Sequence, residues 1–321
     1  MVTTNMAKID VGIVGEINLD LILYGLPEPM PTERELLATG FSMTLGSSSA
    51  ILAHNLSVLG TKVGLITKAG DDALGGIALL RLSEAEVDLS RIVRSQTTAS
   101  GVTVILPHER QRHILTYPGS IFDLRFEDLD LDYLASARHF HMSSIFLQRG
   151  MRERIPELFE LMKTKGLSTS LDTNDDPDDR WEDPLQETLD FIDVLFPNER
   201  EACKIANRSS LQEAMPRLAE RVPLVVVKCG DRGAIAIKGR ETVSSPSVEA
   251  NAVDPVGAGD SFDAGFLHQY LRGADLATCL AYGNVAGAYS TTQPGGTEAF
   301  RDRAKQQQFF ASAAASSELS R

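Results

Sequence analysis

The chain has 321 residues, of which 43% are hydrophobic and 23% are charged, and this composition excludes a chain that is disordered throughout. Its 31 Lys and Arg against 44 Asp and Glu give a formal net charge of −13. This charge argues against a protein dedicated to nucleic acid or anionic membranes, because phosphate backbones require clustered cations. The three cysteines, Cys203, Cys229 and Cys279, lack the paired short spacing of a disulfide framework or a zinc site. We therefore expect a cytoplasmic protein.

The first third of the chain predicts strands and helices in alternation. Residues 9–14 and 63–66 are short apolar runs that read as buried strands. Helices are predicted over 49–59, where Gly60 provides a C-terminal stop, and over 73–84. Residues 102–106 and 114–117 flank a polar turn and predict an antiparallel hairpin.

The rest of the chain repeats the alternation more regularly. Strands are predicted at residues 139–142, 167–171, 194–196 and 224–228. Helices are predicted near 152–165, 199–206, 210–220, 258–271, 275–289 and 298–310. This order implies an α/β fold with a doubly wound, mostly parallel sheet flanked by helices.

Two extended polar segments, about 16–45 and 97–120, interrupt the pattern and predict a small β-sheet. A small sheet beside a doubly wound core suggests a lid over a cleft at the carboxyl ends of the strands. We expect one domain over 9–310, with flexible tails at 1–8 and 311–321.

Residues 254–260, Asp-Pro-Val-Gly-Ala-Gly-Asp, carry the strongest chemical signal. The small residues Gly257, Ala258 and Gly259 precede an apolar helix, so backbone N–H groups can converge on an anion at its N-terminus. Asp260 lies in the first turn. The spacing leaves two roles open for it, a charge that stabilises the helix dipole or a general base beside an anion hole. No Gly-Lys-Ser/Thr follows, which excludes a Walker A loop.

Residues 254–260 resemble the DxxGAGD signature of the ribokinase/PfkB-type carbohydrate kinase family. Further segments resemble motifs of that family in the same order: GEINLD at 15–20, the glycine and helix of 46–60, GDDALG at 70–75, NERE at 198–201 and GDRG at 230–233. The resemblance extends over about residues 10–300. It implies a ribokinase-like fold and a kinase that transfers the γ-phosphate of ATP to a hydroxyl, usually a hydroxymethyl group.

By this resemblance, Asp260 is the general base and the backbone of 257–259 forms the anion hole. The resemblance implies ATP and Mg²⁺ as cofactors, with Asn198 and Glu201 handling magnesium through water. Asp254 is implied in binding a monovalent cation, K⁺ in many members. The alternatives are helix capping by Asn198 and Glu201, and a simple turn-starting role for Asp254.

The family pattern also implies two binding regions. The nucleotide is expected along Lys228, Gly230 and Gly233 and against Asn284, unless the Asn284 side chain is merely solvated. The sugar is expected to contact Asn18, Asp20, Gly46 and Ser47, since Asn and Asp match the hydroxyls of a sugar. The alternative for Asn18 and Asp20 is a pair of polar residues at a strand end.

Three positions depart from the family pattern. Ser47 replaces the second residue of a glycine pair, and Ile51 stands where many members have a substrate-contacting Asn. Asp176 stands where some sugar-acid kinases have an Arg, so an acidic acceptor lacks its expected counter-charge. A neutral sugar, a polyol or a nucleoside is therefore the expected acceptor. A nucleoside kinase and a catalytically silent sensor of the same fold remain alternatives, and the lid suggests a homodimer.

Overall fold

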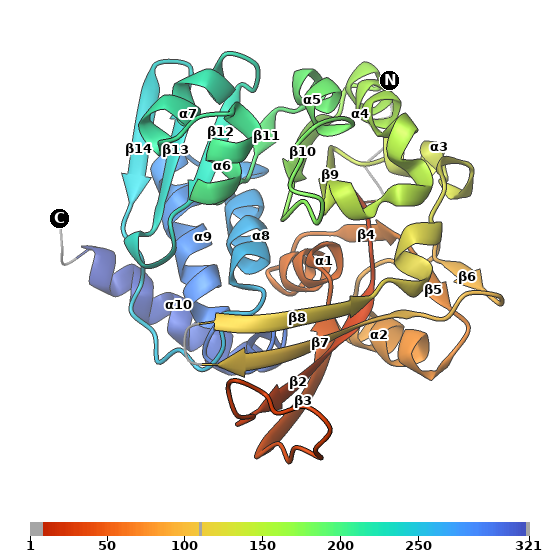
Figure 1. The fold of residues 1–321 in the computed structure, drawn as a ribbon. Coiled ribbons are helices and arrows are strands. Elements are labelled where there is room, and N and C mark those ends of the chain that lie inside the picture. Colours follow the sequence, from red (N-terminus) through yellow and green to blue (C-terminus); the bar gives the residue numbers. More distant parts are fainter. Residues whose placement is uncertain (1–8, 109–110, 319–321) are drawn as a thin grey trace.

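The computed structural model describes residues 9–108 and 111–318, so the predicted tail at 1–8 lies outside the described residues. Its centre is a sheet of eight strands in the order β14-β13-β12-β11-β10-β9-β1-β4 (Figure 1). The strands are β1 (Val11–Val14), β4 (Val63–Ile66), β9 (His139–Ser143), β10 (Ser168–Asp172), β11 (Val194–Leu195), β12 (Leu224–Lys228), β13 (Ala234–Lys238) and β14 (Glu241–Ser245).

The strands from β4 to β12 pair in parallel, as the apolar runs predict. All residues of β1 and β4 are buried, because helices cover both faces of this part of the sheet. The antiparallel strands β13 and β14 were not predicted. They lie at one edge, and β14 has no fully buried residue, so its sequence carries no apolar run.

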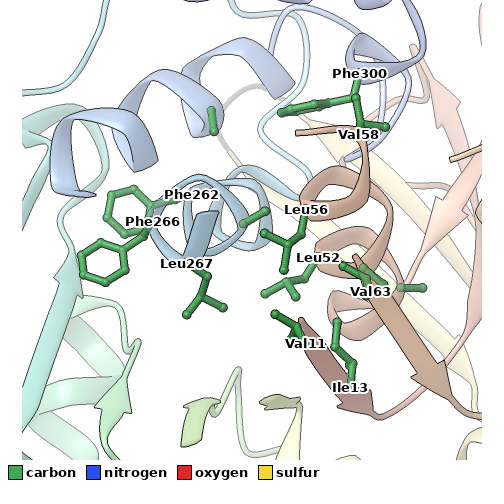
Figure 2. Close-up of a cluster of buried hydrophobic side chains, with 14 of the residues drawn as sticks. Val11, Ile13, Leu52, Leu56, Val58, Val63, Phe262, Phe266, Leu267 and Phe300 are labelled. Atoms are coloured by element: carbon green, nitrogen blue, oxygen red, sulfur yellow. The ribbon is translucent and has the colours of Figure 1, made fainter. Parts of the chain in front are cut away.

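Helices flank the sheet on both sides. A buried hydrophobic cluster lies on each face of the sheet. One packs β1 against α1, α8 and α9, and the other packs β9 and β10 against α4 and α7. Figure 2 shows the first cluster, in which Leu52 and Leu56 of α1 lie between β1 and Leu267 of α8. The helices are α1 (Ser48–Val58), α2 (Ala73–Glu84), α3 (Leu131–Ala135), α4 (Ile155–Thr164), α5 (Leu185–Thr188), α6 (Glu199–Ala206), α7 (Leu211–Ala219), α8 (Ala258–Tyr270), α9 (Leu276–Ser290) and α10 (Arg303–Glu318).

Short 3₁₀ turns join several elements: Gly119–Asp123, Phe126–Asp128, Ile145–Leu147, Arg149–Arg154, Leu189–Phe191, Gly230–Arg232 and Ala299–Arg301. Over the described parts of the chain, no helix combines the length and the apolar character that a bilayer span needs.

The two interrupting segments form the predicted small sheet, in the order β3-β2-β7-β8. Its strands are β2 (Asn18–Tyr24), β3 (Gly40–Gly46), β7 (Gly101–His108) and β8 (Gln111–Tyr117). Since β2 starts four residues after β1 ends and β3 leads directly into α1, this sheet is attached at the carboxyl end of β1. We call it the lid sheet. A two-stranded sheet of β5 (Lys68–Gly70) and β6 (Val93–Ser95) was not predicted.

The C-terminal segment differs from the prediction of one helix over 298–310 followed by a tail. A 3₁₀ turn, Ala299–Arg301, is followed by a new helix, α10, that continues to Glu318. The break occurs at Asp302, whose carboxylate accepts the backbone N–H of Lys305 at 3.0 Å and so caps α10. Residues 319–321 of the predicted tail lie outside the described residues.

Aromatic packing holds this segment to the core. The buried ring of Phe300 lies 5.3 Å from that of Tyr289 and 6.5 Å from that of Phe310, measured between centroids. We expect Phe300→Ala to lower the free energy of unfolding by about 3–5 kcal/mol, because it removes a fully buried ring. Urea denaturation would measure the loss. Leu37→Ala is the control, since Leu37 is 79% exposed, and a similar loss in both variants would contradict this account.

Candidate active site

The turn before α8 is fixed by one buried carboxylate. Asp254 is 3% exposed; its Oδ1 accepts the N–H of Val256 at 2.9 Å and its Oδ2 accepts the N–H of Gly295 at 3.0 Å. Gly257 then adopts a left-handed conformation with φ 72°. A Cβ at Gly257 would overlap the backbone of Gly296, so only glycine fits. The turn predicted at residues 254–259 is therefore present, and its geometry requires glycine at position 257.

Ala258 and Gly259, in the first turn of α8, line a cavity. Helix geometry leaves the N–H groups of this turn without an i−4 partner. The amide of Ala258 donates to the carbonyl of Pro255 at 3.2 Å, so it is partly engaged within the turn. Gly259 and Asp260 follow in the same turn. The arrangement is suited to an anion, because the helix dipole adds roughly half a positive charge at this end.

Asp260 has the chemical properties that a general base requires. It is 9% exposed, and burial raises its pKa to about 6, with the charge of Asp172 adding to the rise. The charge of Lys228 and a hydrogen bond with Ser48 oppose the rise. A carboxyl group tuned toward neutral pH is ionised in the cell and still basic enough to accept a proton.

The predicted sugar-contacting residues come together beside Asp260. Asn18 donates from Nδ2 to Thr103 Oγ1 at 2.6 Å, and the Ser47 hydroxyl donates to Asn18 Oδ1 at 3.0 Å. A Cβ at Gly46 would overlap the side chains of Asn18 and Asp20, so this glycine makes room for both. Burial raises the pKa of Asp20 to about 7, and the charge of Asp260 is the next cause, which places the two carboxyl groups near each other.

Two of the three departures from the family pattern, Ser47 and Ile51, lie beside these residues. Ser47 has backbone angles φ 68° and ψ 132°, a conformation that favours glycine, and its hydroxyl donates a hydrogen bond to Asn18. Ile51 packs against the turn: its Cδ1 would lie 2.7 Å from a Cβ at Gly296 and 3.2 Å from one at Gly257. Ile51 therefore gives the site an apolar wall.

The predicted nucleotide residues line a cavity of about 970 Å³. Lys228, Gly230, Gly233 and Asn284 all contribute to its wall, together with the first turn of α8 and residues 247–252. The Asn284 amide is not solvated: its Nδ2 donates to the carbonyls of Ser245 at 3.1 Å and Pro246 at 2.9 Å. Asn284 thus holds the loop that follows β14 in place.

Asn198 and Glu201 form a capping box at the start of α6. Asn198 Oδ1 accepts the N–H of Glu201 at 2.9 Å, and Glu201 Oε2 accepts the N–H of Asn198 at 2.8 Å. Glu201 is 6% exposed, and burial raises its pKa to about 7, with the charge of Asp172 as the next cause. Within the described residues, no group of three or more His, Cys, Asp or Glu is arranged to hold a metal. The hard oxygens of this pair fit a magnesium ion contacted through water.

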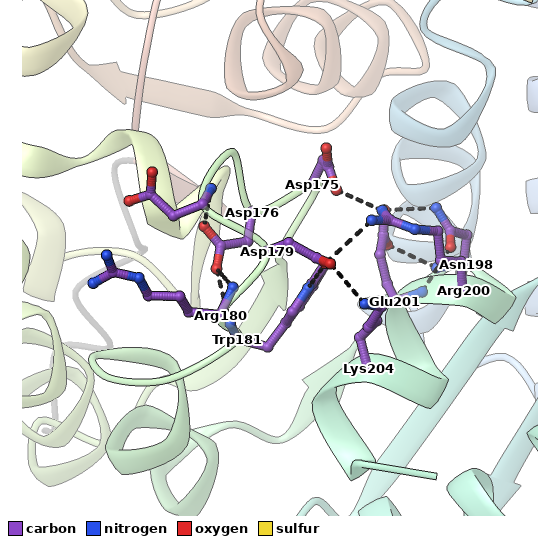
Figure 3. Close-up of polar contacts among 10 residues, drawn as sticks. Asp175, Asp176, Asp179, Arg180, Trp181, Asn198, Arg200, Glu201 and Lys204 are labelled. Carbon is purple, nitrogen blue, oxygen red and sulfur yellow. Dashed lines mark hydrogen bonds and ion pairs between the residues drawn. The ribbon is translucent and has the colours of Figure 1, made fainter. Parts of the chain in front are cut away.

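The acidic segment near Asp176 folds upon itself (Figure 3). The Asp176 carboxylate accepts the backbone N–H groups of Arg180 at 2.7 Å and Trp181 at 2.8 Å. Ion pairs link Asp175 to Arg200 at 2.5 Å and Asp179 to Lys204 at 2.7 Å, so the loop is tied to α6. Asp176 is therefore a loop-organising residue here.

Several contacts of the site were missed from the sequence. Asn55 Nδ2 donates to Ser261 Oγ and to the Gly296 carbonyl, both at 2.9 Å, and so joins α1 to α8. The Lys228 ammonium lies 2.7 Å from Asp172 Oδ2 and 3.0 Å from Asp263 Oδ2. One available signal was the position of Asp172 at the carboxyl end of a parallel strand, where ligand sites of such sheets gather.

The model of the pfkB family carbohydrate kinases matches residues 8–303. An uncharacterized sugar kinase of Archaeoglobus fulgidus is 27% identical over 248 residues, covering 76% of this chain and 96% of that protein. A nucleoside kinase of Methanothermobacter thermautotrophicus is 26% identical over 288 residues, covering 89% of this chain and 90% of that protein. A deoxyribokinase of Salmonella typhimurium is 26% identical over 300 residues, covering 89% and 94%.

Solved structures show the same fold. An E. coli protein of the ribokinase II type, in complex with ATP and Mg²⁺, superposes with a TM-score of 0.84 at 23% identity, covering 94% of this chain and 99% of that one. Ribokinase of Arabidopsis thaliana, complexed with ribose and ATP, gives 0.80 at 22% identity, covering 94% and 98%. The fold is ribokinase-like. The chain belongs to the pfkB family of carbohydrate kinases and is a phosphotransferase that acts on an alcohol group.

Proposed function

We propose that the protein transfers the γ-phosphate of ATP to a hydroxyl, in particular a hydroxymethyl group, of a neutral sugar or sugar-like molecule. The observation that carries this proposal is the position of Asp260, a buried carboxyl with a pKa of about 6, in the first turn of α8. The proposed proton acceptor, Asp260, thus lies at the helix end that we propose binds phosphate, the N-terminus of α8. The substrate side is supplied by Asn18 and Asp20 on the lid sheet.

In this mechanism the acceptor hydroxyl binds between the lid sheet and Asp260. Its proton moves to the Asp260 carboxylate as its oxygen bonds to the γ-phosphorus, and the bond from that phosphorus to the bridging oxygen of ADP breaks. The amides of the 257–259 turn and first helical turn stabilise the negative charge of the transferring group. Lys228, Gly230 and Gly233 line the ATP side of the site.

Magnesium bound with ATP supplies positive charge to the phosphates. Asn198 and Glu201 would hold it through water, since Glu201 is buried, Asn198 is half-buried and both carry the hard oxygen ligands that magnesium prefers. For Asp254, a role beside a monovalent cation such as K⁺ is supported by the burial of its carboxyl group, which is 3% exposed. We further propose that residues 9–310 act as one kinase domain, working in the cytoplasm where ATP is supplied.

Charge favours a neutral acceptor. Asp20 feels the negative charges of Asp254 and Asp260, and Glu16 adds to those felt by Asp260. Arg112 is the one cation that acts on Asp20 among the described residues. An acceptor that carries a carboxylate or phosphate would be repelled in such a pocket.

A nucleoside acceptor is the second candidate, and one observation favours it. The inner face of the lid sheet continues from Asp20 into an apolar cluster of Ile22, Ile105 and Val256. Together with the Ile51 side chain, these residues, which are 0–7% exposed, form an apolar layer behind the polar side chains of the lid sheet, and a nucleobase would favour such a layer.

We expect Asp260→Asn to lower kcat by about 10²–10⁴-fold, because Asn cannot accept the hydroxyl proton. ADP release with MgATP, across neutral sugars, polyols, sugar acids and nucleosides and with and without K⁺, would measure it and identify the acceptor. Asp132→Asn is the matched control, since Asp132 is an exposed residue in the first turn of α3. Equal turnover in wild type and Asp260→Asn would rule out Asp260 as the base.

The pH profile gives a separate test of Asp260. Its carboxylate must be ionised to accept a proton, so kcat at saturating acceptor should rise about tenfold per pH unit below about pH 6 and level off above it. Steady-state rates at saturating MgATP from pH 5 to 8.5 would show this limb. A profile that is flat across that range would contradict the assignment.

We also propose that two copies pair through the outer face of the lid sheet. Phe41, Leu115 and Tyr117 are 62%, 56% and 55% exposed and share the face opposite Asp20. They lie on β3 and β8, the two edge strands, whose unpaired backbone groups favour association.

Light scattering after size exclusion should therefore give a dimer for the wild type and a monomer for Leu115→Glu combined with Tyr117→Glu. Leu80→Glu is the control, because Leu80 is 58% exposed on α2, outside the lid sheet. A wild-type protein that is monomeric at micromolar concentration would disprove this pairing.

A further inference from the structure

Beside the turn before α8 lies a charge cluster of which the mechanism above uses only Lys228, as part of the wall on the ATP side. The Lys228 ammonium is held between Asp172 Oδ2 at 2.7 Å and Asp263 Oδ2 at 3.0 Å. The two carboxyl side chains are 2% and 0% exposed, and that of Lys228 is 14% exposed. Two carboxyl groups therefore share one ammonium in the protein interior.

The remaining oxygen of Asp263 points to its protonation state. Asp263 Oδ1 is buried, and among the described residues no donor reaches it. A buried carboxylate oxygen without a donor is costly, whereas a carboxylic acid can donate from it. Because both carboxyl groups contact the same ammonium, they lie close to each other in a buried site, and the negative charge of one disfavours ionisation of the other.

The electrostatic directions agree with this geometry. Burial is the largest cause that raises the pKa of Asp263 well above its ordinary value, and the charge of Asp172 and a hydrogen bond with it add to the rise. Burial would also raise the pKa of Asp172, but the charge of Lys228 and the hydrogen bond with Asp263 hold it below its ordinary value. Asp172 is therefore the ionised member and Asp263 the neutral one.

The cluster lies directly against the proposed catalytic turn. A Cβ at Gly259 would stand 3.5 Å from the Lys228 ammonium nitrogen, so that charge adjoins the first turn of α8. Asp263 lies one turn after Asp260 on the same helix. Asp263 thus links the position of the ammonium to the helix that carries the base.

We propose that Asp263 is a positioning residue that, as a neutral carboxylic acid hydrogen-bonded to Asp172, holds the Lys228 ammonium beside Gly259. The cluster is then electrically neutral, and its positive end faces the site where phosphate would bind. Were both carboxyls ionised, the cluster would carry a net negative charge and oppose an incoming phosphate. The role in phosphate binding rests on the proposed function, whereas the protonation of Asp263 does not.

Other ionisable groups also act on this cluster, and the test must separate them. Asp260 shares helix α8, Glu201 lies on α6, and His141 on β9 acts on Asp172 and Lys228. Burial lowers the pKa of His141 to about 3, so this ring is neutral at working pH. Since Asp260 and Glu201 titrate in the wild type and in any variant at position 263, their effects largely cancel when the two are compared.

Asp263→Asn keeps the shape and a hydrogen-bond donor but cannot titrate. Above pH 5 the unfolded wild-type chain has released the Asp263 proton that the folded protein keeps, so the wild type loses stability as pH rises. The unfolding equilibrium constant of the wild type should therefore grow about tenfold per pH unit relative to that of Asp263→Asn between pH 5 and 8. A ratio that does not change with pH would overturn the proposal.

Asp263→Ser repeats the comparison with a second residue that cannot titrate, should Asp263→Asn not fold. Because unfolding needs no substrate, these measurements stand even if the proposed acceptor is wrong.

The kinetic test uses the acceptor on which turnover is found. Asp263→Ala should lower kcat by about 10²-fold with little change in acceptor KM, an effect of the size measured when an enzyme loses one hydrogen-bond donor to its transition state. Asp263→Asn should restore most of it, and an equal loss in both variants would contradict a neutral Asp263.

Discussion

The site depends on one close backbone contact, in which Gly257 and Gly296 approach so tightly that a Cβ on the first would overlap the second. Asp254 fixes this contact by accepting amide hydrogens from both segments, and Asn55 fixes it from α1. Because these three hydrogen bonds hold the turn, the first residues of α8, Ala258 and Gly259, are fixed at the wall of the cavity. The place of Asp260 follows from that start.

Much of the fold could be predicted from local pattern. The fully buried parallel strands appear as apolar runs, and α2 and α6 were predicted with the bounds that they have. The edge strand β14 was missed because none of its residues is fully buried and it carries no apolar run, and the short strand β13, AIAIK, was missed although four of its residues are apolar. The division of the last helix was missed because Asp302 caps α10 by a local hydrogen bond that periodicity does not reveal.

In the site, too, features formed by neighbouring residues were predicted, whereas contacts between distant residues were not. The turn before Asp260 is contiguous, so sequence and family resemblance together indicated it, whereas its role as base remains a proposal. The contact of Asn55 with Ser261 spans 206 positions, and that of Lys228 with Asp172 spans 56. Such contacts arise from strand order and helix packing, which a single sequence does not specify. Asn284 was expected to bind the nucleotide; it lines the cavity beside the first turn of α8, and its amide secures the loop after β14.

The helix α10 connects the cavity beside the first turn of α8 to the aromatic packing of the C-terminal segment. Phe309 of this helix helps to line that cavity, and its neighbour Phe310 packs against Tyr289 and Phe300. Loosening of this packing would therefore displace one wall of the cavity, whereas the turn at 257–259 is held separately by Asp254 and Asn55.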